Sequence, residues 1–111
     1  MKRTHTLNPL IERYHFDFNE CTPAKGWAQI DTGQDASYFG AWTNPATLQI
    51  VQFTEGDITR TQCVNQAQYC AELRSMKSWN DQQGWGMKID GMCRVEIVEQ
   101  FRALGLADLL H

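Results

Sequence analysis

The sequence predicts an α+β fold, an antiparallel four- to five-stranded meander sheet at about residues 13–63 followed by two C-terminal helices packed on one face as a two-layer sandwich. Short segments rich in aromatic and β-branched residues follow one another before residue 63, with turn residues between them. Helical periodicity replaces this pattern after Cys63. The chain has 111 residues, a usual length for one compact domain.

The beginning of the chain is expected to lie outside that domain. Residues 1–12 are interpreted as a flexible N-terminal arm, because Pro9 and a charged Lys-Arg pair discourage packing. The single α+β domain then covers residues 13–111. Its first strand is predicted at residues 13–18, where polar and aromatic side chains alternate without interruption.

Four more strands are predicted along the next part of the chain. The short connections between them favour an antiparallel meander. The alternation changes phase between Ile50 and Val51, so either both faces of the sheet are covered or a bulge intervenes. Residues Ile58 to Gln62 mix β-branched and polar side chains, which is typical of an exposed edge strand. The predicted strands are residues 27–31, 37–42, 48–53 and 58–62.

The first helix is predicted over about residues 65–82. Asn65 is followed three residues later by Gln68, a spacing that resembles a capping box. Apolar side chains then recur at helical spacing, namely Tyr69, Leu73, Met76 and Trp79.

The second helix is predicted between two glycine-containing segments. Gly84 and Gly86 end the first helix, and Asp90 is a candidate cap for the second. Gly105 is placed to end that helix in a left-handed conformation, with Leu106 folding back on the last turn. The apolar stripe of this helix is Val95, Ile97, Val98, Phe101 and Leu104.

Composition indicates a folded, cytoplasmic protein. Hydrophobic residues make up 42% and charged residues 21%, unlike a disordered chain. No apolar run follows the basic first residues, and no segment approaches the roughly 20 apolar residues that span a bilayer. We therefore expect a cytoplasmic location and no membrane contact.

The negative charge is concentrated in the predicted sheet. The whole chain carries −3, whereas residues 14–73 hold two basic residues, Lys25 and Arg60, against seven acidic ones, a net of −5. Such a segment disfavours direct nucleic-acid binding. It favours a protein partner, which could carry a basic surface.

No motif in the sequence indicates a cofactor, a metal or a set of catalytic residues. The four cysteines, Cys21, Cys63, Cys70 and Cys93, lack the close pairs of zinc sites, and a cytoplasmic location disfavours disulfides. We interpret them as small buried side chains with reduced thiols. Gly84-Trp85-Gly86 matches no phosphate-binding motif. A non-enzymatic protein is favoured, although enzymatic activity stays open.

Two functional hypotheses follow. The first is a small non-enzymatic protein-binding or regulatory module, with a narrower version in which it is an accessory or inhibitory protein of a mobile genetic element. Pairing through the edge strand Ile58 to Gln62 would also allow a homodimer. The interface residues that we predict are Trp85, Asp31, Asp35, Glu55 and Asp57.

The alternative is a small-molecule-binding domain or enzyme. Its pocket would lie between the aromatic face of the sheet and the helices. The predicted lining residues are Tyr38, Trp42 and Tyr69. A cavity with convergent polar groups would favour this alternative, whereas a filled core and an exposed apolar patch would favour the first hypothesis.

Overall fold

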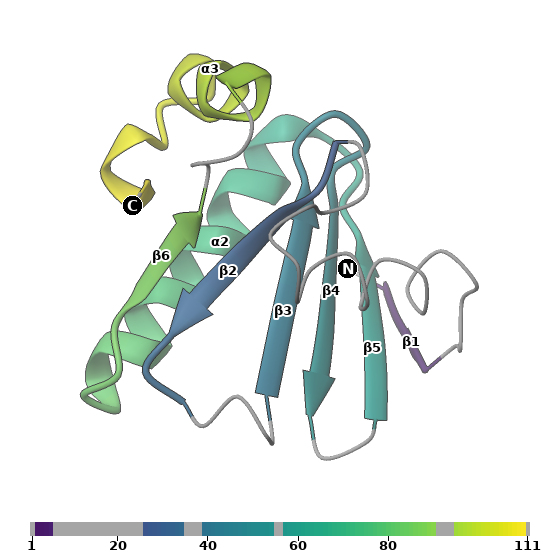
Figure 1. Ribbon diagram of the computed structural model, residues 1–111. Helices are drawn as coiled ribbons and strands as arrows, with labels where there is room; N and C mark the ends of the chain where they lie inside the picture. The colour runs from purple at the N-terminus through teal and green to yellow at the C-terminus, as the bar shows by residue number, and fades with distance from the viewer. Residues whose placement is uncertain (1, 6–25, 35–38, 55–56, 91–94, 111) are drawn as a thin grey trace.

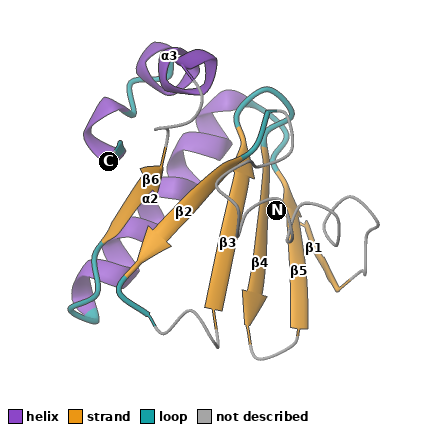
Figure 2. Cartoon of the chain, in the orientation of Figure 1, coloured by secondary structure: helices purple, strands orange, loops and turns teal. Residues whose placement is uncertain are grey.

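The computed structural model describes residues 2–5, 26–34, 39–54, 57–90 and 95–110. It confirms the α+β class, because an antiparallel sheet is followed by helices that pack on one of its faces (Figure 1). Among the described residues, six strands form one sheet in the order β1-β5-β4-β3-β2-β6. Their bounds, coloured orange in Figure 2, are β1 Lys2–His5, β2 Ala28–Thr32, β3 Phe39–Asn44, β4 Gln49–Thr54, β5 Asp57–Gln62 and β6 Met87–Asp90. Strands β2 to β5 form the predicted meander.

Strand β5 is not an edge strand, which corrects one prediction. Its backbone pairs with β4 on one side and with β1 on the other, where Lys2 lies opposite Gln62 and His5 opposite Thr59. The chain's own first strand therefore already occupies residues 59–62 on the side where a second copy was expected to pair. Four residues of the expected flexible arm are thus part of the sheet, and the predicted strand at residues 13–18 lies outside the described residues.

Strand β6 was not predicted from the sequence. It pairs with β2 and directs Met87 and Ile89 into the core while Lys88 is exposed. Asp90, interpreted above as a helix cap, is the last residue of this strand.

The change of phase at Ile50 and Val51 reflects a sheet that is covered on both faces. The register of β4 with β3 and β5 runs without interruption, so no bulge intervenes. Ile50 belongs to the large cluster beneath the helices, and Val51 belongs to a second cluster with Trp27 and Trp42. Neighbouring residues of a strand point to opposite faces, so each of the two is buried on its own side.

Helix α2, Gln66–Gln82, begins and ends with hydrogen bonds that its sequence provides. The Asn65 side chain accepts from the Gln68 N–H at 2.8 Å, and the Gln68 side chain accepts from the Val64 N–H at 2.8 Å. This resembles the predicted capping box, with the return bond shifted by one residue. Neither this helix nor the shorter α3, Val95–Ala103, has the length and apolar character needed to cross a membrane.

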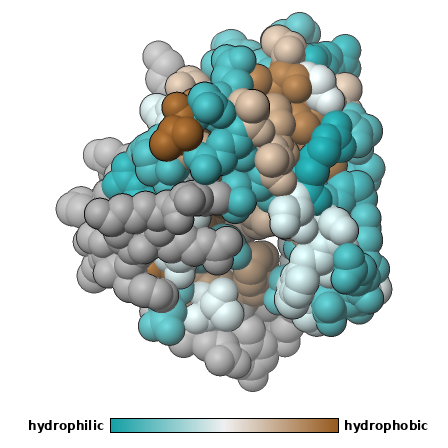
Figure 3. All heavy atoms as spheres, turned by 180° about the vertical axis from the view of Figure 1, so that it is seen from behind, coloured by the Kyte–Doolittle hydropathy of each residue, from teal (hydrophilic) through white to brown (hydrophobic). Residues whose placement is uncertain are grey.

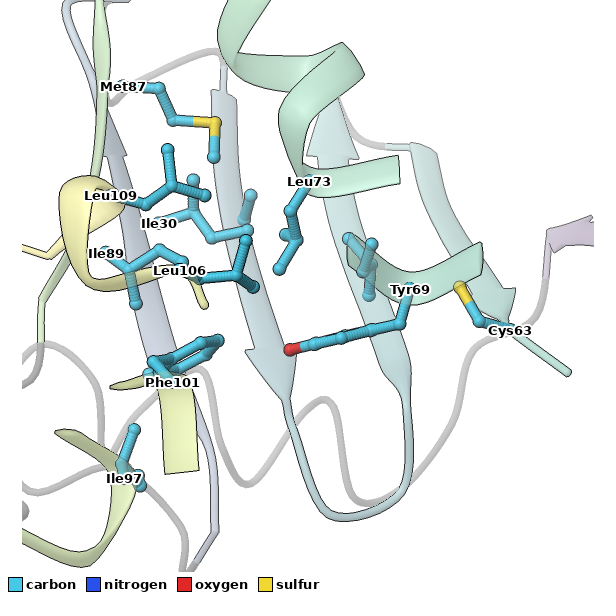
Figure 4. Packing of buried hydrophobic residues seen from close by; sticks show 13 residues of the cluster. Ile30, Cys63, Tyr69, Leu73, Met87, Ile89, Ile97, Phe101, Leu106 and Leu109 are labelled. Atoms are coloured by element: carbon cyan, nitrogen blue, oxygen red, sulfur yellow. The ribbon is translucent and has the colours of Figure 1, made fainter. Parts of the chain in front are cut away.

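The C-terminal segment packs against the same face as α2. Helix α3, Val95–Ala103, ends at Gly105, whose φ of 78° lets the Leu106 N–H bond the Phe101 carbonyl at 2.9 Å. A short 3-10 helix, η1 Ala107–Leu109, follows. In Figure 4, Phe101, Leu106 and Leu109 extend into the same core as Leu73 and Tyr69 of α2. The core is therefore filled near β6 and the C-terminal helices.

Candidate functional site

A cleft of about 380 Å³ lies between α2 and the ends of β3 and β4. Figure 3 shows that the face carrying α2 is hollowed beside the helix. Its apolar lining consists of Phe39, Met76 and Trp79, and its single charged lining residue among those described is Glu72. The uncharged polar lining residues are Gln34, Gln52, Thr54, Ser75 and Asn80.

Two regular elements place these side chains together. Alternate residues of β4 point to the helix side, so Ile50 fills the core while Gln52 and Thr54 continue the same face into the cleft. On α2, lining residues recur three or four positions apart, as in Glu72, Ser75 and Trp79. This spacing brings them to one side of the helix.

Asn80 is the buried lining residue that fixes the surroundings of the cleft. Its side chain is buried, and its amide donates to the Met76 carbonyl at 2.8 Å. Its side-chain oxygen accepts from the Gln34 amide at 3.2 Å. Its backbone carbonyl accepts from the N–H groups of Trp85 and Gly86 at 2.9 and 3.2 Å. One residue therefore joins the helix end, the turn after β2 and the turn before β6.

Two tryptophans are exposed next to the cleft. Trp79 and Trp85 are 51% and 41% exposed, and their ring centroids lie 5.5 Å apart at 56°. The way in which α2 ends accounts for part of this contact. Gly84 has a φ of 85°, and the Trp85 N–H donates to the Asn80 carbonyl in the last helical turn. An apolar contact across such a turn is common in this C-terminal motif. Both tryptophan residues nevertheless remain exposed to solvent.

The open side of the cleft has unused hydrogen-bonding capacity. Within the described part of the chain, the side chains of Gln52, Thr54 and Ser75 make no hydrogen bond. The cations nearest in sequence on α2 are engaged elsewhere: Arg74 bonds Asp108 and Lys77 bonds Asp81, each at 2.9 Å.

The structure places two of the residues that were predicted to line a pocket on opposite faces of the sheet. Tyr69 is fully buried in the cluster beneath the helices, whereas Trp42 is buried in the cluster on the opposite face of the sheet. Tyr38 lies outside the described residues. The cleft lies farther along the sheet, where Phe39 is the first described residue of β3.

The predicted interface residues are dispersed. Trp85 is exposed as that hypothesis requires, and Asp57 is exposed at the start of β5. Asp31 lies opposite Lys88 in the register of β2 and β6, and it points to the other face from Ile30. Asp57 lies opposite Thr54 and shares its side of the sheet. Asp31 and Asp57 therefore do not form one acidic patch, and Asp35 and Glu55 lie outside the described residues.

Sequence reasoning missed the pairing of Trp79 with Trp85. Trp79 was interpreted as the last member of an apolar helix stripe, although its position one turn before the helix end and Trp85 directly after Gly84 match a glycine-capped helix end. That spacing could have predicted the contact. The convergence of Gln52 with Ser75 depends on how α2 crosses the sheet, for which the sequence carries no local signal.

Burial favours the neutral forms of two core side chains, Cys63 and Tyr69. Burial raises the pKa of the Cys63 thiol, and the Glu72 carboxylate raises it further. Burial also raises the pKa of Tyr69 well above its usual range. Cys63 and Cys70 carry free thiols, and the described residues contain no group of three or more His, Cys, Asp or Glu side chains that could hold a metal ion.

Comparison with known proteins matches the chain to no family model, to no curated protein and to no solved structure. The function is therefore argued from the geometry of the tryptophan pair and the cleft.

Proposed function

We propose that this chain is a non-enzymatic protein-binding module that docks its partner on the Trp79–Trp85 pair. The observation that supports the proposal is the exposure of two adjacent indoles, 51% and 41%, on a helix end that is fixed by hydrogen bonds. Tryptophans are enriched among residues that dominate binding energy in protein interfaces. Because their support is already ordered, little conformational entropy is lost when a partner covers them.

The experiment is affinity purification from the native host with matched variants of the full chain. Trp79→Ala with Trp85→Ala should lose the captured partner, because truncation of an interface hot spot costs at least about 2 kcal/mol. The control is Val64→Ala with Val95→Ala, which removes two apolar side chains that are 78% and 73% exposed elsewhere.

The captured protein is then purified and its dissociation constant is measured against each variant. The proposal is supported if the dissociation constant rises at least about thirtyfold with the tryptophan variant and less than about twofold with the valine variant. Equal binding by both variants, each shown to be folded by circular dichroism, refutes it. The narrower proposal of an accessory or inhibitory protein of a mobile genetic element requires a basic, nucleic-acid-associated partner.

The cleft supports a second candidate function, the binding of a small molecule. Its volume of about 380 Å³ lies in the usual range of ligand pockets, and apolar walls with a few polar groups are typical of them. Mass spectrometry of the protein purified under native conditions tests this candidate. A bound compound that Ser75→Phe excludes would support it, because that side chain would fill the cleft.

A further inference from the structure

The cleft has the features that a guanidinium group requires. Trp79 offers a partly exposed indole, Glu72 offers a carboxylate, and oxygen atoms of Gln52, Thr54 and Ser75 complete the lining. We propose that the cleft receives an arginine side chain of the partner protein. This inference rests on the proposed function and names the partner residue that would enter beside the tryptophan pair.

The charges around the cleft favour a cationic occupant. Among the described lining residues there is one carboxylate and no lysine or arginine. Arg74 and Lys77 do not line it, and each is paired with an acid of its own. Glu72 has another interaction in the structure, but the two oxygens of a carboxylate have about four acceptor sites in all. It can therefore accept from a guanidinium in addition.

The distribution of acceptors favours arginine over lysine. A guanidinium is planar and has five N–H donors in a fixed fork, whereas an ammonium is a compact point charge with three. Gln52 and Thr54 lie on the sheet and Ser75 lies on the helix, so acceptors approach from both walls. The indole of Trp79 provides a flat face on which a guanidinium can stack.

The position of the cleft links it to the proposed docking surface. Trp79 lines the cleft and also contacts Trp85 outside it. An apolar group of the partner on the pair and an arginine in the cleft would therefore both contact the Trp79 side chain. A single short segment of the partner could supply both.

The test is an NMR titration of the full chain with three small probes. N-acetyl-arginine amide, its lysine counterpart and its citrulline counterpart differ in charge and shape, and citrulline replaces the guanidinium by an uncharged group of nearly the same form. We expect the arginine probe to shift the Trp79 indole N–H and the Gln52 side-chain amide signals. The citrulline probe should bind at least about tenfold more weakly, and the lysine probe several-fold more weakly.

A charge-matched pair of variants tests the position of the site. Glu72→Gln should weaken binding of the arginine probe about tenfold, because the substitution removes the carboxylate and keeps the side-chain length. Glu99→Gln removes an equal charge from an exposed position of α3 and should leave binding unchanged. Equal binding of arginine and citrulline, equal effects of the two variants, or no shift with any probe would overturn the inference.

The two proposals fail in distinguishable ways. Trp85 does not line the cleft, so Trp85→Ala should weaken binding of the partner protein while the arginine probe still binds Glu72 and its neighbours. If binding of the partner protein depends on Trp85 and not on Glu72, the proposed function is retained and the arginine site is rejected. Binding of the arginine probe without any tryptophan-dependent partner would reject the proposed function and retain a guanidinium site.

Discussion

A buried pair of hydroxyl groups joins α2 to the sheet. The Thr43 hydroxyl donates to the Gln49 carbonyl at 2.8 Å and also contacts the Tyr69 hydroxyl. Since the Thr43 proton is used for the carbonyl, the Tyr69 hydroxyl must be the donor to Thr43. Both residues are completely buried, so the Tyr69 hydroxyl depends on Thr43 for its hydrogen bond. This pair gives Tyr69 a structural role.

Removing the two sides of this pair should have unequal effects. Tyr69→Phe leaves Thr43 its bond to Gln49 and should lower the free energy of unfolding by about 1 kcal/mol. Thr43→Val keeps the shape of the side chain but leaves the buried Tyr69 hydroxyl without a hydrogen-bond acceptor. The free energy of unfolding should therefore fall by about 2 kcal/mol. The double variant should cost less than the sum, because it contains no buried tyrosine hydroxyl that has lost its acceptor. Urea denaturation measures all three, and strict additivity would contradict the pairing.

Burial of Tyr69 and Cys63 predicts lower stability at alkaline pH. Both pKa values are raised in the folded protein, while in the unfolded chain the phenol and the thiol ionise near their ordinary pKa values of 10.0 and 9.0. Above these values the unfolded state binds fewer protons than the folded state, so stability falls as pH rises. Below about pH 8 it should be independent of both groups.

The matched variant isolates the tyrosine contribution. Tyr69→Phe should reduce the loss of stability above about pH 10 by up to about 1.4 kcal/mol per pH unit, the value for one proton. The measurement is the free energy of unfolding in urea at about pH 8 and in steps above about pH 10. An unchanged alkaline slope in the variant would contradict the prediction.

At the scale of elements, close contact between two turns positions the exposed tryptophans. A Cβ added to Gly33 would lie 2.8 Å from the Trp85 carbonyl oxygen and 3.0 Å from its Cα. These are backbone atoms, which cannot move aside as the end of a flexible side chain can. The turn after β2 thus fits against the turn before β6 only because residue 33 has no side chain.

Gly33→Ala should therefore displace the Trp85 turn. We expect a loss of about 1 to 3 kcal/mol in the free energy of unfolding, together with a change in the near-ultraviolet circular dichroism of the indole pair. Gly105→Ala is the control, since its φ of 78° gives backbone strain but no atom lies within 4 Å of the added carbon. That variant should lose stability and keep the tryptophan signal, and an equal change of signal in both would disprove the contact.

Local patterns predicted the elements whose partners are close in sequence. Strands β2 to β5, the Asn65 cap and the Gly105 end of α3 were all predicted, because alternation, capping residues and turn residues act within a few positions. Strand β6 was missed because its four residues are too few to show a period. The prediction that β5 is an edge strand was wrong because its neighbour β1 lies at the beginning of the chain, far from β5 in sequence. Pairing over such a separation has no local signature in the sequence.

At the scale of the whole molecule, the C-terminal segment completes the core. Leu106 and Leu109 are 1% and 0% exposed, and they share one cluster with Ile30 of the sheet and Leu73 of α2. Arg74 of α2 bonds the Asp108 carboxylate at 2.9 and 3.0 Å and also bonds the Gly105 carbonyl. This ion pair is exposed and contributes little to stability. The leucines therefore fix the segment.

If the C-terminal segment and the sheet share one core, a change in the segment should destabilise the entire domain. Leu109→Ala should reduce the free energy of unfolding by about 2 to 5 kcal/mol, the usual cost of a cavity at a fully buried leucine. Leu110→Ala, at a partly exposed neighbour, should cost less. Far-ultraviolet circular dichroism follows the helices, whereas fluorescence includes Trp27 and Trp42 on the opposite face of the sheet. Both signals should shift together to lower urea, and a fluorescence midpoint that stays at the wild-type value would show that the segment unfolds independently of the sheet.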